Sequence, residues 1–129
     1  CKPSLAASRL AGGPSILNVA SMSAFFAVPV VPAYGAAKAG VVQMTKNLAV
    51  AWAGEGIRVN AVAPGLVATR MTAGMQGVPA VEQPQLERTA MKRWGTPDEI
   101  APTFLYLASV AARFITGETV CVDGGYTAT

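Results

Sequence analysis

The chain has 129 residues, of which 52% are hydrophobic and 13% charged, and its formal net charge is +3. This length and composition fit one unusually apolar globular domain and exclude an intrinsically disordered chain. The ten lysines and arginines are scattered from Lys2 to Arg113 instead of forming a basic stripe, so nucleic acid is not expected as a partner. A surface with so few charges favours self-association.

The sequence has two cysteines, Cys1 and Cys121, and no histidine. Cysteines at opposite ends without metal-ligand spacing argue against a disulfide framework and against a metal site, and the lack of histidine excludes a histidine-based triad. Cys121 lies in an apolar run and is expected to be a small core residue. No targeting leader is expected at the start of the chain, and the reducing cytoplasm is the expected compartment.

The first half of the chain predicts a helix end, a strand, a long helix and a second strand. Residues 4–10 are expected to end a helix that is stopped by Gly12, Gly13 and Pro14. Residues 15–20 form an apolar strand, and a loop extends to residue 32. Residues 33–54 form a helix with slim first turns (Gly35, Ala36, Ala39, Gly40) and one bulky stripe (Val41, Met44, Leu48, Trp52). Residues 57–62 are the next strand.

The second half predicts a lid, a helix and a last strand. Residues 66–93 contain several helix breakers (Gly74, Gly77, Pro79, Pro84), a pattern that is typical of a mobile lid. Thr96, Pro97 and Glu99 predict a helix start with a capping box. The buried stripe of this helix is expected to be Ile100, Phe104, Leu107 and Ala111, and Pro102 is expected to kink its first turns or to destabilise it by about 3 kcal/mol. Residues 119–122 are predicted to form the last strand.

Residues 10–37 carry no charge and are long enough to span a bilayer. Pro14, Pro29 and Pro32 break any continuous helix there, which indicates globular core and no membrane partner. The order strand, helix, strand, helix, strand, with apolar strands, predicts an α/β fold with a parallel sheet covered by helices on its faces.

Ligands of such sheets bind beyond the carboxyl ends of the strands. Ser21 follows the first strand, Pro64 and Gly65 follow the second, and Tyr34 begins the helix between them. Lys38 comes four residues after Tyr34, so both side chains share one helix face. The sequence therefore predicts a hydroxyl, a phenol and an ammonium at one rim.

This trio suits proton transfer. A phenol with an ordinary pKa of about 10 is a poor acid–base catalyst at neutral pH, and a neighbouring ammonium favours its phenolate form. A serine hydroxyl can hold a carbonyl or alcohol against the phenol, but the hydride must come from a nicotinamide. Taken alone, the Tyr-x-x-x-Lys spacing also fits a helix-surface pair in which a lysine stem packs on a ring.

The wider pattern resembles the short-chain dehydrogenase/reductase family, closest to its ketoreductase-like and sugar-alcohol dehydrogenase-like branch. The helix motif is Tyr34-Gly-Ala-Ala-Lys38-Ala-Gly, thirteen residues after Ser21. The strand motif is Ile57-Arg-Val-Asn60-Ala-Val-Ala-Pro64-Gly65. The C-terminal motifs are Arg93-Trp-Gly-Thr-Pro-Asp-Glu-Ile100 and Ile115-Thr-Gly-Glu-Thr-Val-Cys-Val-Asp-Gly-Gly125. The resemblance covers nearly the whole chain and implies a Rossmann-like doubly wound parallel sheet.

The resemblance implies a role for each matching residue. Tyr34 would be the general acid/base, Lys38 would assist it and hold the nicotinamide ribose, and Ser21 would polarise the carbonyl; Ser23 would be an ordinary loop hydroxyl. Pro64, Gly65 and the backbone of Val67 would line the nicotinamide ring, and Thr69 would bond its carboxamide or, equally, cap the next helix. Asn60 and Asp123 would be structural, as a strand residue and a turn former.

The same resemblance implies NAD or NADP as cofactor and a homodimer or homotetramer built on the 33–54 helix and the last strand. The family's Gly-rich phosphate turn has no counterpart in residues 1–129, which correspond to the C-terminal half of a single domain. The chain is thus part of a complete enzyme, a short non-enzymatic remnant or self-associating binding module, or a fragment studied for its folding. The apolar side chains of the loop and lid (Phe25, Phe26, Val28, Val30, Met71, Met75) predict a fairly apolar carbonyl or secondary alcohol as substrate.

Overall fold

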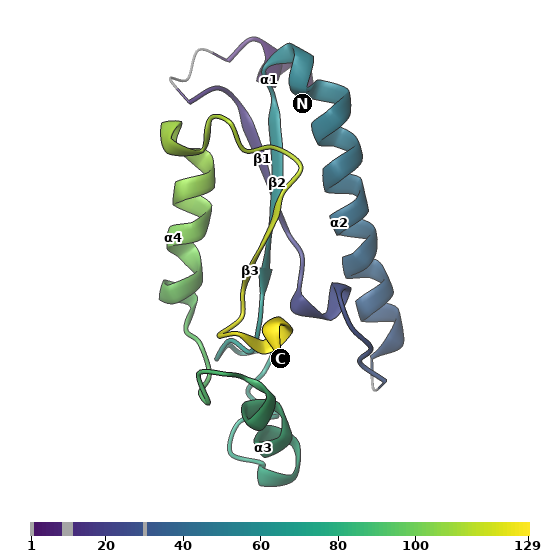
Figure 1. Cartoon of the computed structure of the whole chain (residues 1–129), viewed down its shortest axis with the longest axis vertical. Helices are drawn as coiled ribbons and strands as arrows, with labels where there is room; N and C mark the ends of the chain where they lie inside the picture. The colour runs from purple at the N-terminus through teal and green to yellow at the C-terminus, as the bar shows by residue number, and fades with distance from the viewer. Residues whose placement is uncertain (1, 9–11, 30) are drawn as a thin grey trace.

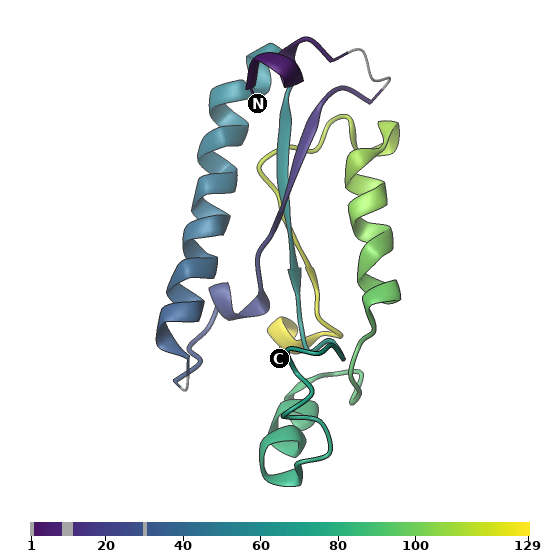
Figure 2. The same ribbon diagram turned by 180° about the vertical axis from the view of Figure 1, so that it is seen from behind.

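A computed structural model describes residues 2–8, 12–29 and 31–129. A three-stranded sheet lies between two long helices, α2 (Pro32–Trp52) and α4 (Pro97–Ala108), which cover opposite faces (Figure 1, and from behind in Figure 2). A short helix, α3 (Pro79–Arg88), lies beyond the carboxyl ends of the strands. The first helix, α1, spans Lys2–Ala6, so the prediction of helix was wrong for residues 7 and 8, and residues 9 and 10 lie outside the described residues.

The strands β1 (Ser15–Val19), β2 (Arg58–Pro64) and β3 (Thr119–Val122) are parallel and in the order β1-β2-β3. Ser15 pairs with Arg58, and Ala61 pairs with Thr119. The central strand is buried over its first six residues, whereas β1 and β3 each pair on one side only. The predicted parallel α/β sheet is therefore confirmed, with β1 and β3 as its edge strands in the described part of the chain.

Helix α2 packs on the sheet through Val42, Thr45 and Ala49. The Thr45 hydroxyl accepts a hydrogen bond from Asn18 Nδ2 at 2.9 Å and donates to the Val41 carbonyl at 2.8 Å, which fixes the helix to β1. Met44, predicted to share the bulky stripe, is 45% exposed. It is exposed because the sheet covers only one side of α2, so the stripe that faces inward lies one position later along the helix.

Helix α4 begins with the predicted capping box, in which Thr96 and Glu99 cap each other's backbone. Ile100 and Leu107 are buried, but Ala111 is exposed and Ala112 is buried in its place. The prediction failed there because α4 ends at Ala108 and a 3₁₀ turn changes the spacing.

Two prolines lie inside helices. Pro102 lies inside α4, and Pro84, predicted as a breaker, lies inside α3. Each proline is the sixth residue of its helix, so it removes one backbone bond while the rest of the helix continues.

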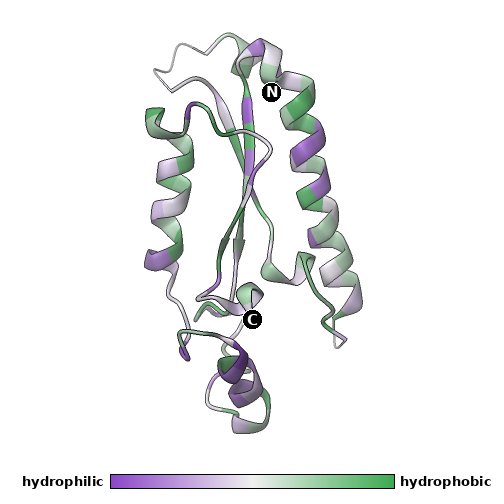
Figure 3. Cartoon of the chain, in the orientation of Figure 1, coloured by the Kyte–Doolittle hydropathy of each residue, from purple (hydrophilic) through white to green (hydrophobic). Residues whose placement is uncertain are grey.

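The segment 66–93, called the lid here, consists of turns at residues 70–77 followed by α3. It is the most hydrophilic part of the chain in Figure 3 and has one fully buried threonine, Thr89. The breakers at residues 74 and 77 lie in the turns before α3, whereas the mobility of the lid stays a prediction.

Cys121 is exposed, so its prediction as a core residue was wrong. The neighbouring Val120 and Val122 pack against the core below α4. Alternation along the strand therefore turns Cys121 to the opposite face, where α2 covers β1 and β2. In the described part of the chain, no helix combines the length and apolarity needed to cross a bilayer.

Candidate active site

An open pocket of about 660 Å³ lies at the carboxyl ends of the strands. Its lining includes every residue that the sequence analysis assigned to catalysis or cofactor binding: Ser21, Tyr34, Lys38, Pro64, Gly65, Val67 and Thr69. The pocket is bounded by the ends of β1 and β2, the first turns of α2 and α4, and the start of the lid. The topology thus brings together residues that are separated by up to 48 positions in the sequence.

Ser21 follows β1 in an extended conformation (φ −163°, ψ 153°) and caps the 3₁₀ turn Met22–Ala24. Its hydroxyl oxygen accepts hydrogen bonds from the Ser23 backbone N–H at 3.2 Å and from the Ser23 hydroxyl at 3.0 Å. Because both bonds are accepted, the Ser21 O–H proton remains available for a ligand in the pocket.

Tyr34 and Lys38 lie one helical turn apart at the start of α2, as predicted. The ammonium nitrogen of Lys38 is 5.7 Å from the centroid of the Tyr34 ring and donates a hydrogen bond to the Val19 carbonyl at 2.9 Å. The Tyr34 ring is 40% exposed, and no described residue bonds its hydroxyl. The phenol and two of the three ammonium protons therefore face the pocket without protein partners.

The segment after β2 supplies one backbone donor. Val67 makes an isolated parallel bridge with Gly95, and its carbonyl accepts from the Thr72 hydroxyl at 2.6 Å. No described residue accepts from the Val67 N–H. An unpaired N–H on a pocket wall suits an amide or carboxylate oxygen of a ligand.

Gly65 has a structural role that the sequence did not reveal. A Cβ at this position would lie 2.5 Å from the Cα of Asp123. The glycine is required because the turn after β3 crosses directly over the end of β2.

Thr69 does not cap a helix, since α3 starts ten residues later with Val78 as its N-cap. The hydroxyls of Thr69 and Thr72 are 3.3 Å apart, and Thr72 accepts from the Thr69 N–H at 3.0 Å. The capping alternative is therefore wrong for Thr69, whose side chain lines the pocket.

Sequence reasoning missed the role of Ser23, whose side chain is buried and bonded to Ser21. A Cβ on Gly35 would lie 3.1 Å from the Ser23 carbonyl oxygen. The small residues at the start of α2 therefore allow the loop that starts at Ser21, called the serine loop, to approach the helix closely. The signal was present in the Ser-Met-Ser spacing and the glycine after Tyr34, but neither indicates this contact by itself.

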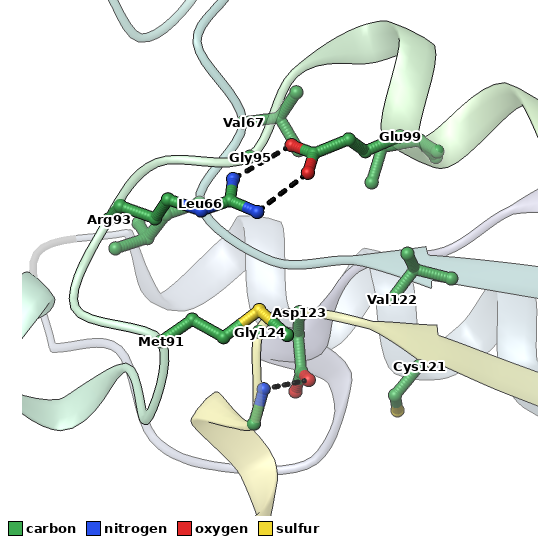
Figure 4. A pocket seen from close by; sticks show the side chains of 12 residues that line it. Leu66, Val67, Met91, Arg93, Gly95, Glu99, Cys121, Val122, Asp123 and Gly124 are labelled. Carbon is green, nitrogen blue, oxygen red and sulfur yellow. Dashed lines mark hydrogen bonds and ion pairs between the residues drawn. The ribbon is translucent and has the colours of Figure 1, made fainter.

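A second pocket of about 340 Å³ lies between the base of the lid and β3 (Figure 4). Its charged groups are already paired. Arg93 makes two bonds to Glu99 at 2.7 and 2.9 Å; these, with the Thr96 N–H, lower the Glu99 pKa to about 2. Burial acts to raise the pKa of Asp123, but bonds from Thr127 and from the Gly125 N–H outweigh it and lower that pKa. This pocket therefore offers a ligand fewer unpaired polar groups than the first pocket does.

The remaining structural assignments are confirmed. Asn60 is fully buried, donates to the Ile115 carbonyl at 2.9 Å and accepts from the Glu118 N–H at 3.0 Å. It joins β2 to the segment before β3. Asp123 accepts from the Gly125 and Thr127 backbone N–H groups, as a turn former does. In the described residues, no three metal-binding side chains gather.

Known proteins are similar to the chain in sequence and in fold. Residues 3–127 match a family model described as enoyl-(acyl carrier protein) reductase. The L-tagatose-forming galactitol 2-dehydrogenase of Cereibacter sphaeroides is 47% identical over 90% of the chain and 46% of its own length.

Solved structures are similar to the chain as well. A gluconate 5-dehydrogenase of Burkholderia cenocepacia, in complex with NADP and tartrate, is 33% identical with a TM-score of 0.91 over 99% of the chain and 49% of its own. A 4-hydroxyisoleucine dehydrogenase complexed with NADH is 36% identical with a TM-score of 0.86 over 92% of the chain and 48% of its own. The chain thus spans about half the length of the relatives that it matches. Its motifs, its sheet and these similarities place it in the short-chain dehydrogenase/reductase family.

Proposed function

We propose that the chain carries the proton-transfer half of an NAD- or NADP-dependent oxidoreductase that interconverts a carbonyl and a secondary alcohol. The observation that carries this proposal is the convergence of Ser21, Tyr34 and Lys38 on one pocket, with the protons of all three side chains available to a ligand. Residues 1–129 form the C-terminal part of a single Rossmann-like domain, and the phosphate-binding turn belongs to a part of the domain that these residues do not contain.

Each residue has a defined task. The Ser21 hydroxyl donates to the carbonyl oxygen and orients it. Tyr34 gives its phenolic proton to that oxygen in reduction and takes it back in oxidation. Lys38 places a positive charge beside the phenol, 5.7 Å from its ring centroid, and stabilises the phenolate that remains after transfer.

The residues present fit the nicotinamide end of a dinucleotide. The unpaired Val67 N–H and the Thr69 hydroxyl can bond its carboxamide, and the Lys38 ammonium can bond ribose hydroxyls. When bound, the nicotinamide supplies or accepts the hydride that the chain's own residues cannot provide. The relatives hold either NADP or NADH; residues 1–129 lack the position at which family members choose between them.

The substrate side of the pocket has mixed character. Met71 and Phe104 supply apolar surface and Arg70 a positive charge, while related enzymes act on galactitol, gluconate or 4-hydroxyisoleucine. We infer a small carbonyl or alcohol substrate acted on by a homodimer or homotetramer. The α2 face opposite the sheet, including Met44 and Val50, is exposed and available for this association.

The test is a spectrophotometric assay of NADH and NADPH oxidation by the purified full-length gene product, with a panel of polyol-derived ketones and aliphatic ketones. Turnover with at least one ketone and the reverse reaction with its alcohol are expected. Binding of neither dinucleotide, with no turnover, would instead favour the alternative of a non-enzymatic, self-associating module.

A further inference from the structure

One set of side-chain contacts outside the pocket joins three segments of the chain. The guanidinium carbon of Arg88, at the end of α3, lies 4.5 Å from the Phe26 ring centroid and 4.6 Å from the Tyr126 ring centroid. The two rings stack with centroids 5.1 Å apart and planes 26° apart. The Tyr126 hydroxyl donates to Gln85 Oε1 at 2.8 Å. These four residues are called the Arg88 cluster.

The four members come from three different parts of the fold. Phe26 lies in the loop that starts at Ser21, and Gln85 and Arg88 lie on the lid helix α3. Tyr126 lies in the C-terminal turn and is only 4% exposed. A cation beside two aromatic faces is attracted to both rings, more strongly where water is excluded.

Backbone contacts bring the lid against the C-terminal turn. The Met91 N–H donates to the Gly124 carbonyl at 3.0 Å, and the Thr129 hydroxyl donates to the Arg88 carbonyl at 3.0 Å. A Cβ on Gly125 would lie 2.8 Å from the Ala90 Cβ, and Gly125 has a φ of +81°. The glycine is therefore required both by its conformation and by the close approach of the lid.

We propose that Arg88 is a positioning residue: its contacts with Phe26 and Tyr126 hold the lid helix and the serine loop in the arrangement that binds substrate. The inference rests on the proposed function and extends it to residues outside the pocket. Arg88 itself does not line the pocket. It acts by setting the distance between the loop that carries Ser21 and the lid that carries Thr69 and Met71.

The experiment compares Arg88→Met, which keeps the length but removes the charge, with Arg88→Lys and with Arg113→Met in the full-length gene product. Arg113 is an exposed arginine that follows the 3₁₀ turn after α4, and its side chain makes no hydrogen bond, ion pair or ring contact with a described residue. Arg88→Met is expected to raise the KM for the carbonyl substrate about fivefold to tenfold, the loss expected for a partly desolvated cation–π contact. The Kd for the dinucleotide should change less than about twofold, since Lys38 and Val67 are untouched.

Two further results separate positioning from general stability. In Arg88→Lys the KM should rise less than in Arg88→Met, because lysine restores a cation near the rings. Arg113→Met should leave the KM unchanged. Hydrogen exchange of the Met91 amide, which bonds to Gly124, should accelerate in Arg88→Met and in neither other variant.

The outcomes also distinguish this inference from the proposed function. If Tyr34→Phe abolishes turnover while Arg88→Met leaves both KM and Met91 exchange unchanged, the positioning role is wrong and the proposed function stands. If the wild-type protein shows no turnover, the proposed function fails, and unchanged Met91 exchange in Arg88→Met would overturn the contact role as well.

Discussion

The two walls of the pocket are held in different ways. Ser21, Tyr34 and Lys38 lie at the end of a strand and on the first turns of a helix, and the Asn18–Thr45 bond fixes that helix to the strand. The lid wall has little regular structure near the pocket and rests on the C-terminal turn. Regular hydrogen-bonded elements place the side chains that we propose for proton transfer, and contacts between remote segments place the side chains that we propose to surround the substrate. Changes on the first wall should therefore reduce chemistry, and changes on the second should reduce binding or stability.

Apart from loss of the Tyr34 hydroxyl itself, the largest effect is expected for Lys38→Met. Loss of the ammonium removes the positive charge beside the phenol that we propose as the proton donor, so kcat/KM should fall by about 100-fold or more. Dinucleotide affinity should weaken as well, since Lys38 is proposed to bond the ribose. Lys46→Met, at an exposed position on the same helix, is the matched control in steady-state kinetics and dinucleotide titration. Equal activity of the two variants would remove Lys38 from the mechanism.

The second effect concerns the contact between the end of β2 and the turn after β3. Gly65→Ala places a Cβ 2.5 Å from Asp123 and should lower the free energy of unfolding by about 1–3 kcal/mol. Gly40→Ala lies within α2 with no atom within 4 Å and should raise it by about 0.5–1 kcal/mol. Urea titration of both variants measures the two changes in the free energy of unfolding, which should have opposite signs. An unchanged free energy of unfolding in Gly65→Ala would show that the turn after β3 can move to accommodate the added methyl group.

A smaller effect is expected for Ser23→Ala, which removes the hydroxyl that donates to Ser21 at 3.0 Å. The Ser21 side chain then loses one constraint, and kcat should fall by about threefold to tenfold, as for loss of one hydrogen bond. Ser109→Ala, which removes a hydroxyl beyond the end of α4, is the control. A change in KM alone would indicate that Ser23 acts through the loop and not through Ser21.

The smallest effect is the pH dependence of the C-terminal turn. The lowered pKa of Asp123 means that its carboxylate stabilises the folded chain above a pH of about 4, the ordinary range of Asp, and that this stability is lost as the pH falls through the folded pKa. Solvent screening keeps the contribution below about 1 kcal/mol. Thermal unfolding between pH 7 and pH 3 should show a shallower acid decline for Asp123→Asn than for Glu87→Gln, and parallel curves would contradict this.

The difference between the walls also explains how much the sequence could predict. Strand and helix positions follow from hydrophobic periodicity, so β3 was predicted to the residue and Ser21, Tyr34 and Lys38 were placed at one edge of the sheet. The spacing of Tyr34 and Lys38 is local, because a helix fixes which residues share a face. The sequence-based roles of both residues remain proposals that kinetics must test.

Contacts between segments that are remote in the chain do not produce a comparable pattern in the sequence. The Arg88 cluster joins residues separated by up to 100 positions, and no pattern within any one segment indicates its partners. Cys121 was misplaced because an apolar run does not show which face of an edge strand is covered. Gly65 was assigned to the ligand, whereas its tightest neighbour is Asp123.

The most direct test of the central claim is Tyr34→Phe in the full-length gene product, with turnover and dinucleotide Kd measured on the same preparation. Tyr106→Phe, on the exposed surface of α4, is the control. Tyr34→Phe is expected to reduce kcat by at least about 100-fold, as for loss of a general acid, while the dinucleotide Kd stays near that of the wild type. Turnover that persists at the wild-type rate in Tyr34→Phe would contradict the claim that this chain carries the proton-transfer residues.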